Sequence, residues 1–530
     1  HIPPSGFLIQ GHPEAIAAAS NLEIVAYVHP LPLAFMVDSH VSDLLSEASE
    51  MPLTSSPATA VQLSGWRLAD LGTPLDHVRL PGLMGNLDTT AATYLTSHRP
   101  IDTGRHHGIL SLDDIATVAA EPALSWLSLE PVFSIDNDRA IGHMRADDVS
   151  NYFVVGLNGS GHTVTVADSG IDRDHGDFDG RLRSPVFNLF GPDNSGADSN
   201  SGHGTHVTST LLGDGSGDSN STGIVPQATF HFYQLEVDSS GILARWGSLY
   251  EMFEHSLLND AYIHTNSWGS ESLVGEYTSD SRSIDWFTND YPEFLVIFSA
   301  GDMGISGVTS PSTAKNALSV GASTTGAFGS DPVGQVFNES SSGPTSDGRI
   351  KPDLVAPGVM ICSARAQEAD LASGGNCSNS LHSDGFTPLY MTLNGSSMST
   401  SVVAGASAMA REFLREEVGM AAPGSDLIRA LLVNGADDIG VQNIPNPREG
   451  WGQLNISNSL LPKSNGVNQS VFYDQGRQLM PGHSFIYTFD VSGGSGIDVT
   501  LAWNDKEGSA SADQNASRLV NNLDLSLIHI

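Results

Sequence analysis

Three short segments of this chain carry residue types that can act together in nucleophilic catalysis. Asp168 ends an apolar run just before a glycine turn, His203 follows a glycine-rich loop, and Ser397 begins a helical stretch after a glycine. A serine can attack a carbonyl, a histidine can take its proton, and a carboxylate can fix the histidine tautomer. Taken singly, the three residues are equally well explained as a turn cap, a metal ligand and a helix cap. Their joint placement favours acyl transfer.

The elements that must position these residues alternate between strands and helices from about residue 137 onward. Apolar strand-like runs lie at 162–167, 228–235, 294–299 and 317–322, and helical stretches lie at 247–261 and 399–416. Such alternation predicts an α/β domain with a parallel sheet that is covered by helices on both faces. Sites in open sheets of this kind form at the carboxyl ends of the strands, where Asp168 falls.

The chain divides into three regions that differ in their pattern of apolar residues. Residues 1–136 contain two similar stretches, 14–32 and 113–131, which each read as a helix, a strand and a proline stop, so we expect a small α+β domain. Chance similarity is the alternative. Residues 137–464 form the alternating region. Residues 465–530 lack helical patterns, and the runs 484–491 and 497–503 predict antiparallel strands of a truncated β domain.

Composition excludes several classes of protein. The 530 residues carry a net charge of −37, so the chain is a poor partner for nucleic acid or an anionic membrane. Only four of its 23 basic residues are lysine, and acidic, lysine-poor chains suit a saline environment. No run of 18 apolar residues predicts a membrane span. Because the chain begins at His1, we expect a fragment or processed piece, and the missing signal peptide carries no information.

The two cysteines, Cys362 and Cys377, exclude a disulfide-rich scaffold and a cysteine-based zinc module. They lie 15 positions apart in a Gly/Ser/Asn-rich stretch. They form either one bridge closing a short loop or two unpaired thiols.

The segments around Asp168, His203 and Ser397 resemble the three signature motifs of the subtilases, the subtilisin-like serine proteases. The resemblance spans about residues 137–464 and extends to the segments 265–269, 299–302, 310–322, 343–358, 430–436 and 450–455. Residues 501–505 and 519–525 are similar to the β-sandwich that follows the catalytic domain in the oxidatively stable alkaline proteases. The region 1–136 is placed like a subtilase prodomain, which assists folding and inhibits the zymogen until it is cleaved.

The resemblance implies a role for each matching position. It makes Ser397 the nucleophile, His203 the general base and then acid, and Asp168 the residue that orients His203. His206 matches a structural position. The strand that pairs with substrate backbone is matched by Ser267, Trp268 and Gly269. One wall of the specificity pocket is matched by Ser299, Ala300 and Gly301. We expect uncharged, apolar or aromatic residues before the scissile bond.

Asp302 departs from the family pattern, which has an oxyanion-binding asparagine here. Loss of such a donor costs about 10²–10³ in turnover, a figure measured in a subtilisin itself. One proprotein-convertase branch and the sedolisins resemble this chain in carrying aspartate. Three hypotheses follow: a protease with an acid-shifted optimum in which protonated Asp302 donates, a protease relying on backbone donors, and an inactive enzyme.

The sequence therefore predicts a secreted or cell-surface serine endopeptidase acting on proteins or peptides, inhibited by its own prodomain. The alternative is an inactive subtilase fold used as an adhesion or carbohydrate-binding module. Prodomain cleavage is expected between Ser134 and Arg145. The resemblance also implies structural calcium, for which the oxygen-rich loop 191–200 is a candidate that equally reads as a solvated turn. No catalytic metal or organic cofactor is expected.

Overall fold

The computed structural model describes residues 157–325, 334–370, 373–440, 443–460, 471–490 and 496–526, together with the backbone of short strands outside these ranges. The chain separates into two compact units, His1–Pro131 and Val132–Ile530. The catalytic motifs lie in the second unit.

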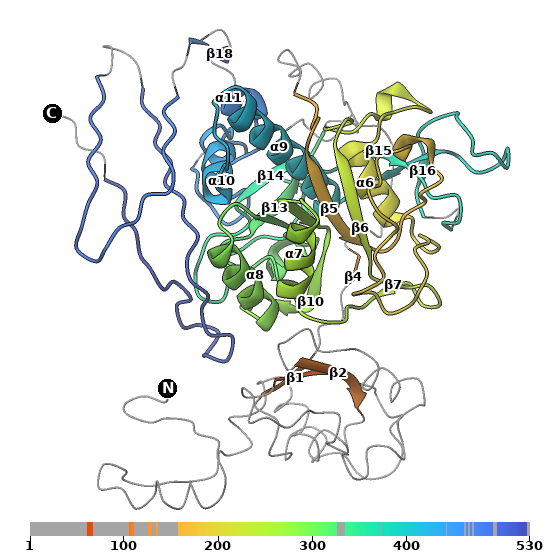
Figure 1. Cartoon of the computed structure of the whole chain (residues 1–530), viewed down its shortest axis with the longest axis horizontal. Helices are drawn as coiled ribbons and strands as arrows, with labels where there is room; N and C mark the ends of the chain where they lie inside the picture. Colours follow the sequence, from red (N-terminus) through yellow and green to blue (C-terminus); the bar gives the residue numbers. More distant parts are fainter. Residues whose placement is uncertain are drawn as a thin grey trace, which may run out of the picture. The chain divides into compact units, whose positions relative to one another are not determined.

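A six-stranded parallel sheet forms the centre of the second unit (Figure 1). Its strand order is β14-β13-β11-β9-β5-β6, and every neighbouring pair is parallel. The strands are β5 (Thr163–Asp168), β6 (Thr229–Gln234), β9 (Ile263–Asn266), β11 (Leu295–Ser299), β13 (Leu318–Ser323) and β14 (Leu354–Pro357). The four strands predicted from apolar runs are β5, β6, β11 and β13, so the predicted fold class is confirmed.

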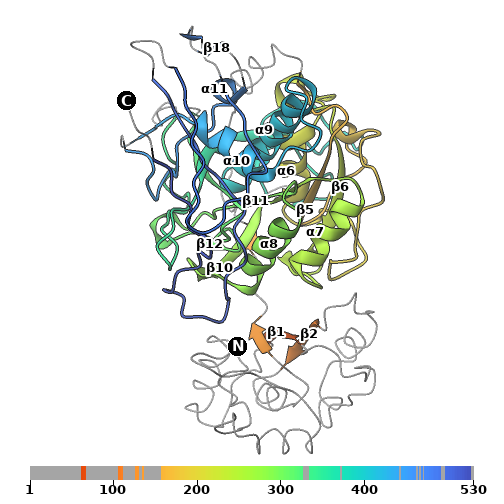
Figure 2. The same ribbon diagram turned by 60° about the vertical axis from the view of Figure 1, so that its left-hand side comes forward.

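Helices cover both faces of this sheet, as the two views in Figures 1 and 2 show. One face packs against α6 (His203–Leu212), α9 (Ser396–Glu416), α10 (Ser425–Asn434) and α11 (Ile456–Leu460), and the other against α7 (Leu249–Leu258) and α8 (Ser279–Asp290). Two separate apolar cores result. Each of α7 and α8 starts with a capping box, Ser248 with Glu251 and Thr278 with Ser281, which satisfies first-turn amides locally.

Short elements complete the second unit. Strand β10 (Trp268–Val274) pairs with β4 (Ser134–Ile135) and β12 (Thr309–Ser310), and β7 (Glu236–Val237) pairs with β8 (Ile242–Leu243). Three single-turn helices are η5 (Gly176–Phe178), η6 (Ser219–Ser221) and η7 (Gly304–Ser306). A two-residue pairing joins β18 (Lys463–Ser464) to β19 (Val467–Asn468).

The first unit contains an antiparallel sheet with the order β2-β1-β3. Its strands are β1 (Val61–Trp66), β2 (Arg105–Leu110) and β3 (Trp126–Leu129). Strand β3 lies within the strand predicted in the stretch 113–131. The predicted helix of that stretch and the whole of 14–32 lie outside the described residues.

The two strands predicted near the C-terminal end are not formed over the described residues 484–490 and 497–503. Figure 1 shows these segments as extended chain beside α10. An antiparallel strand needs a hydrogen-bonded neighbour and a face to bury. Here every residue of 476–490 is exposed, including Phe485, Tyr487 and Phe489, so the alternating apolar side chains have no face to cover.

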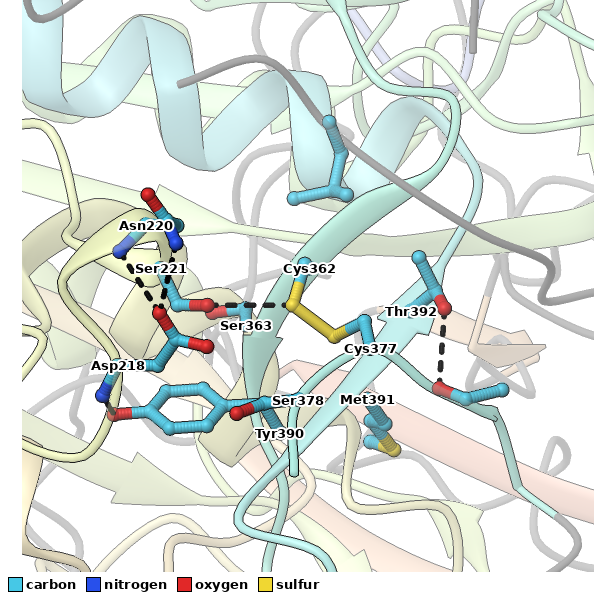
Figure 3. The surroundings of a disulfide bond; sticks show 12 residues. Asp218, Asn220, Ser221, Cys362, Ser363, Cys377, Ser378, Tyr390, Met391 and Thr392 are labelled. Carbon is cyan, nitrogen blue, oxygen red and sulfur yellow. Dashed lines mark hydrogen bonds between the residues drawn. A yellow bond between two sulfur atoms is a disulfide. The ribbon is translucent and has the colours of Figure 1, made fainter. Parts of the chain in front are cut away.

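A disulfide joins Cys362 to Cys377 and fastens a small antiparallel sheet (Figure 3). The sheet has the order β15-β17-β16, with β15 (Ile361–Ala364), β16 (Gly375–Asn376) and β17 (Tyr390–Leu393). Cys362 lies on β15 and Cys377 directly follows β16, which is only two residues long. Since β17 runs into the turn before Ser397, the bridge stabilises the approach to the nucleophile.

Replacing both Cys362 and Cys377 by serine should lower the free energy of unfolding by up to about 3 kcal/mol, because the unfolded chain regains the entropy of an open loop. Denaturant unfolding followed by tryptophan fluorescence measures this. The wild type in reductant is the control and should unfold at the same midpoint as the double variant. An unchanged midpoint in the double variant would contradict the prediction.

Candidate active site

The structure places the three predicted catalytic residues at one edge of the central sheet. Asp168 is the last residue of β5, His203 the first residue of α6, and Ser397 the second residue of α9. Carboxyl ends of parallel strands and amino ends of the following helices meet at such an edge. The alternation of strands and helices therefore brings together residues that lie more than 200 positions apart.

Asp168 and His203 form a buried hydrogen bond. His203 Nδ1 lies 2.6 Å from Asp168 Oδ1, and both side chains are fully buried. The backbone N–H of Ser169 donates to the same carboxylate oxygen at 2.8 Å. This contact places the proton on Nδ1 and leaves the lone pair of Nε2 to act as a base.

The Ser397 hydroxyl donates its hydrogen bond to Ser267 and not to His203. Its Oγ donates to the carbonyl oxygen of Ser267 at 3.1 Å, and Ser267 Oγ donates in return to the carbonyl oxygen of Ser397 at 3.0 Å. His203 Nε2 is buried and has no hydrogen-bond partner among the described residues. Proton transfer from Ser397 to His203 thus requires the Ser397 hydroxyl to turn away from the Ser267 carbonyl, and catalytic hydrogen bonds often tighten only when substrate binds.

The start of α6 is capped from outside the helix. Its N-cap residue, Gly202, has no side chain, and the first-turn amides find other acceptors. Gly204 N–H donates to Ser169 Oγ at 2.9 Å, and Thr205 N–H donates to Asp198 Oδ2 at 2.8 Å. A β-carbon on Gly204 would lie 2.1 Å from the carbonyl oxygen of Gly170. The helix that carries His203 is therefore held against the turn that follows Asp168.

His206, in the same motif, is a structural residue, in line with the role implied by the resemblance. Its Nε2 lies 3.0 Å from the carbonyl oxygen of Ile361 and 3.1 Å from that of Met391. Burial lowers the pKa of His206 to about 3, and the nearby His203 acts in the same direction. A neutral His206 donates from Nε2 and ties α6 to the disulfide-bearing sheet.

Asp302 lies beside the start of α9, where it accepts hydrogen bonds from Ser396, the residue that precedes the nucleophile. Ser396 N–H donates to its Oδ1 at 2.9 Å and to its Oδ2 at 3.2 Å, and Ser396 Oγ lies 3.3 Å from Oδ2. The carboxyl group therefore accepts hydrogen bonds at the positive end of a helix. It occupies the position that the resemblance assigns to the oxyanion donor.

The predicted substrate strand lies at the boundary between β9 and β10. Ser267 separates the two strands, and Trp268 is buried, with its Nε1–H donating to the carbonyl oxygen of Ala167 at 2.9 Å. The backbone of Trp268 and Gly269 pairs antiparallel with Ile135 and Ser134 of β4. This stretch therefore already accepts an extended peptide segment, supplied here by the chain itself.

The predicted pocket wall continues from β11. Ser299 ends the strand and Ala300 and Gly301 follow it, all three buried. Ala300 N–H donates to the carbonyl oxygen of Val320 at 2.8 Å, and Gly301 N–H donates to Ser396 Oγ at 3.2 Å. The wall is thus joined both to the sheet and to the helix that carries the nucleophile.

The candidate calcium loop does not offer a free set of oxygen ligands. Asp193 accepts from the amides of Ser195 and Asp238, and both oxygens of Asp198 accept from Ser169 and Thr205. Within the described ranges, no group of three or more His, Cys, Asp or Glu residues could hold a metal ion. Structural calcium therefore stays a prediction that rests on the family resemblance.

Sequence reasoning missed the residues around the Asp168–His203 pair. Ser169 follows the strand-end acid directly, and Asp198 lies five residues before His203 in the loop that we considered for calcium. A helix that starts after glycine has no cap of its own, and this signals that another side chain must supply acceptors.

Comparisons with known proteins identify the family of this chain. The family model described as the subtilase family matches residues 159–452. The chain is 27% identical over 477 residues to the serine protease/ABC transporter B family protein tagA of Dictyostelium discoideum, covering 71% of this chain and 27% of that protein. It is 28% identical over 315 residues to the serine protease AprX of Bacillus subtilis, covering 57% of this chain and 67% of AprX.

A solved structure shares the fold. Fervidolysin from Fervidobacterium pennivorans, a keratinolytic enzyme related to subtilisin, aligns with a TM-score of 0.53 at 17% identity, covering 80% of this chain and 62% of fervidolysin. The chain spans only about a quarter of the length of tagA, so it corresponds to one part of that larger protein. Because the family model covers more than half of the chain and includes Asp168, His203 and Ser397, the chain belongs to the subtilase family.

Proposed function

We propose that this chain is a serine endopeptidase that cleaves peptide bonds through an acyl-enzyme on Ser397. The observation that carries the proposal is the buried 2.6 Å contact between His203 and Asp168 at the sheet edge where Ser397 also lies. A histidine held in this way is a base ready for a neighbouring hydroxyl. Membership of a family of serine proteases supports the same conclusion.

The reaction follows from the roles of the three groups. Ser397 Oγ attacks the scissile carbonyl as its proton passes to His203 Nε2. Asp168 stabilises the imidazolium that forms, and His203 then gives the proton to the departing amine. A water molecule, activated in the same manner, releases the acyl group and restores Ser397.

The pairing of β4 with Trp268 and Gly269 supports an extended peptide as the substrate. Antiparallel pairing of main chains binds a peptide with little regard to sequence. It also supports the proposed inhibition by residues 1–136, because β4 lies at the end of that region and occupies the strand where substrate would pair. Of the proposed cleavage window, only Ser134 and Ile135 belong to the described residues.

A secreted or cell-surface location, in water of high salt, completes the proposal. The Cys362–Cys377 disulfide is of the kind that persists in oxidising compartments. The net charge of −37 suits solubility in salt. Every helix in the described part of the chain is too short or too polar to cross a bilayer.

A fluorophosphonate probe should label Ser397 in the matured protein, because the probe reacts only with an activated serine. Ser397→Ala should abolish labelling, and Asp168→Asn should slow peptide hydrolysis about 10⁴-fold. Ser407→Ala is the matched control on the same helix, since its hydroxyl only donates to the Val403 carbonyl. Wild type that fails to label at both acid and neutral pH would favour the inactive fold used for adhesion or carbohydrate binding.

Asp302 makes the proposed enzyme acid-shifted. Ser396 N–H lies closer to Asp302 Oδ1, at 2.9 Å, than to Oδ2, at 3.2 Å, so a proton on Oδ2 would provide a donor for the oxyanion. An ionised Asp302 instead sets a negative charge beside the developing oxyanion. Activity should therefore fall as Asp302 loses its proton.

Asp302→Asn should move the pH optimum of kcat/KM upward, because the amide donates at every pH. At alkaline pH the variant should exceed the wild type by up to about 10²–10³-fold, the contribution of one oxyanion donor. A pH–rate profile on a peptide amide measures both proteins side by side. If the wild type matches the variant at alkaline pH, backbone donors alone serve the oxyanion.

A further inference from the structure

Asp198 is linked to the Asp168–His203 pair through the side chain of Ser169. Ser169 Oγ donates to Asp198 Oδ1 at 2.8 Å and lies 3.3 Å from Asp168 Oδ1. The side chain of Asp198 is fully buried, as are those of Ser169 and Asp168. The catalytic carboxylate is thus the end of a buried chain of hydrogen-bonding groups.

The same carboxylate fixes the start of the helix that carries His203. Its second oxygen accepts the amide of Thr205 at 2.8 Å, and Ser169 Oγ accepts the amide of Gly204 at 2.9 Å. These two amides follow His203 directly and have no acceptor within the helix. Asp198 therefore holds both the turn that carries Asp168 and the helix that presents His203.

Neighbouring backbone leaves this arrangement little freedom. A β-carbon on Gly170 would lie 2.0 Å from the carbonyl oxygen of Ala197, and Ile171 N–H donates to the carbonyl oxygen of Gly196 at 3.0 Å. The loop that carries Asp198 is thus pressed against the turn after β5. A small displacement of Asp198 would therefore also displace Ser169 and the first turn of α6.

We propose that Asp198 is a positioning residue, which acts through Ser169 and the first turn of α6 to hold His203 in register with Asp168. The inference deepens the proposed function and rests on it. Asp198 itself touches neither substrate nor the reacting atoms. Its contribution is geometric, and a misplacement of about 1 Å in a catalytic group costs about 10²-fold in rate.

A neutral substitute for Asp198 is expected to fold. Burial, reinforced by the charge of Asp168, raises the pKa of Asp198 to about 7, while hydrogen bonds from Thr205 and Ser169 act in the opposite direction. A raised pKa means that the ionised carboxylate is disfavoured in the folded state, so its contribution to stability falls as the pH rises towards 7. Asparagine avoids this cost but loses an acceptor.

The test compares Asp198→Asn with the wild type and with Glu236→Gln in the full chain. Glu236 belongs to the same buried acidic group. Burial and the charge of Asp198 raise its pKa to about 8, which favours the neutral form at pH 7, so glutamine is a conservative replacement. Asp198→Asn should lower kcat at least tenfold with KM within twofold, while circular dichroism shows a folded protein. Glu236→Gln should stay within twofold of the wild type.

Ser169→Ala removes the hydroxyl that donates to Asp198 and accepts from Gly204. It should lower kcat to a similar extent, and the double variant with Asp198→Asn should lose little more, since groups acting as one unit are not additive. A kcat of Asp198→Asn within twofold of the wild type overturns the proposal. So does an equal loss in Glu236→Gln, or a double variant whose losses multiply.

Proton NMR gives a readout that does not depend on hydrolysis. The Nδ1 proton of His203 should resonate far downfield in the wild type, and Asp198→Asn should move it upfield or broaden it. If the wild type neither cleaves peptides nor labels, the proposed function fails, and this resonance still decides the role of Asp198. An identical resonance in both proteins overturns the inference.

Discussion

The hydrogen bond between His203 and Asp168 is the interaction on which the rest of this domain depends. Both side chains are buried, and an imidazole beside a carboxylate is costly to bury unless the geometry of the pair is fixed. The sheet supplies one half of the solution by ending β5 at Asp168. The start of α6 supplies the other half by presenting His203 from its first residue.

Close backbone contact, together with the hydrogen bonds of the Ser169 and Asp198 side chains, fixes the relative position of these two elements. A β-carbon on Gly204 would overlap the carbonyl oxygen of Gly170, and a β-carbon on Gly170 would overlap that of Ala197. The backbone of residues 197 and 198 also lies against Gly170. Gly170 and Gly204 are therefore required by the close approach of three backbone segments.

Much of this arrangement could be predicted from sequence because it depends on local patterns. Apolar runs marked β5, β6, β11 and β13, and the glycine turns marked where Asp168, His203 and Ser397 would lie. The contacts that hold them could not be predicted in this way. The approach of Asp198 to Thr205, the pairing of β4 with Trp268, and the direction of the Ser397 hydroxyl all depend on tertiary structure.

The C-terminal prediction failed for a related physical reason. Alternating apolar residues at 484–490 have the period of a strand, but period alone provides neither a neighbouring strand nor a surface to cover. The comparison between these residues and β5 is instructive, because β5 has the same local preference and is enclosed on both faces. Tertiary partners decide which of the two patterns becomes a sheet.

The segment 496–526 has a consequence for where this domain can be divided. The ammonium group of Lys315 contacts Asp505 Oδ2 at 2.7 Å and the carbonyl oxygens of Lys506 and Arg518. Asn316 exchanges hydrogen bonds with the backbone of Asp505, and Arg429 donates to Trp503. A protein shortened to residue 464 would keep every catalytic group, yet it would leave a buried cation without these partners beside the sheet that carries the pocket wall. The segment that lacks strands of its own is thus part of the folded unit, and an expression boundary drawn from the catalytic motifs alone would cut through it.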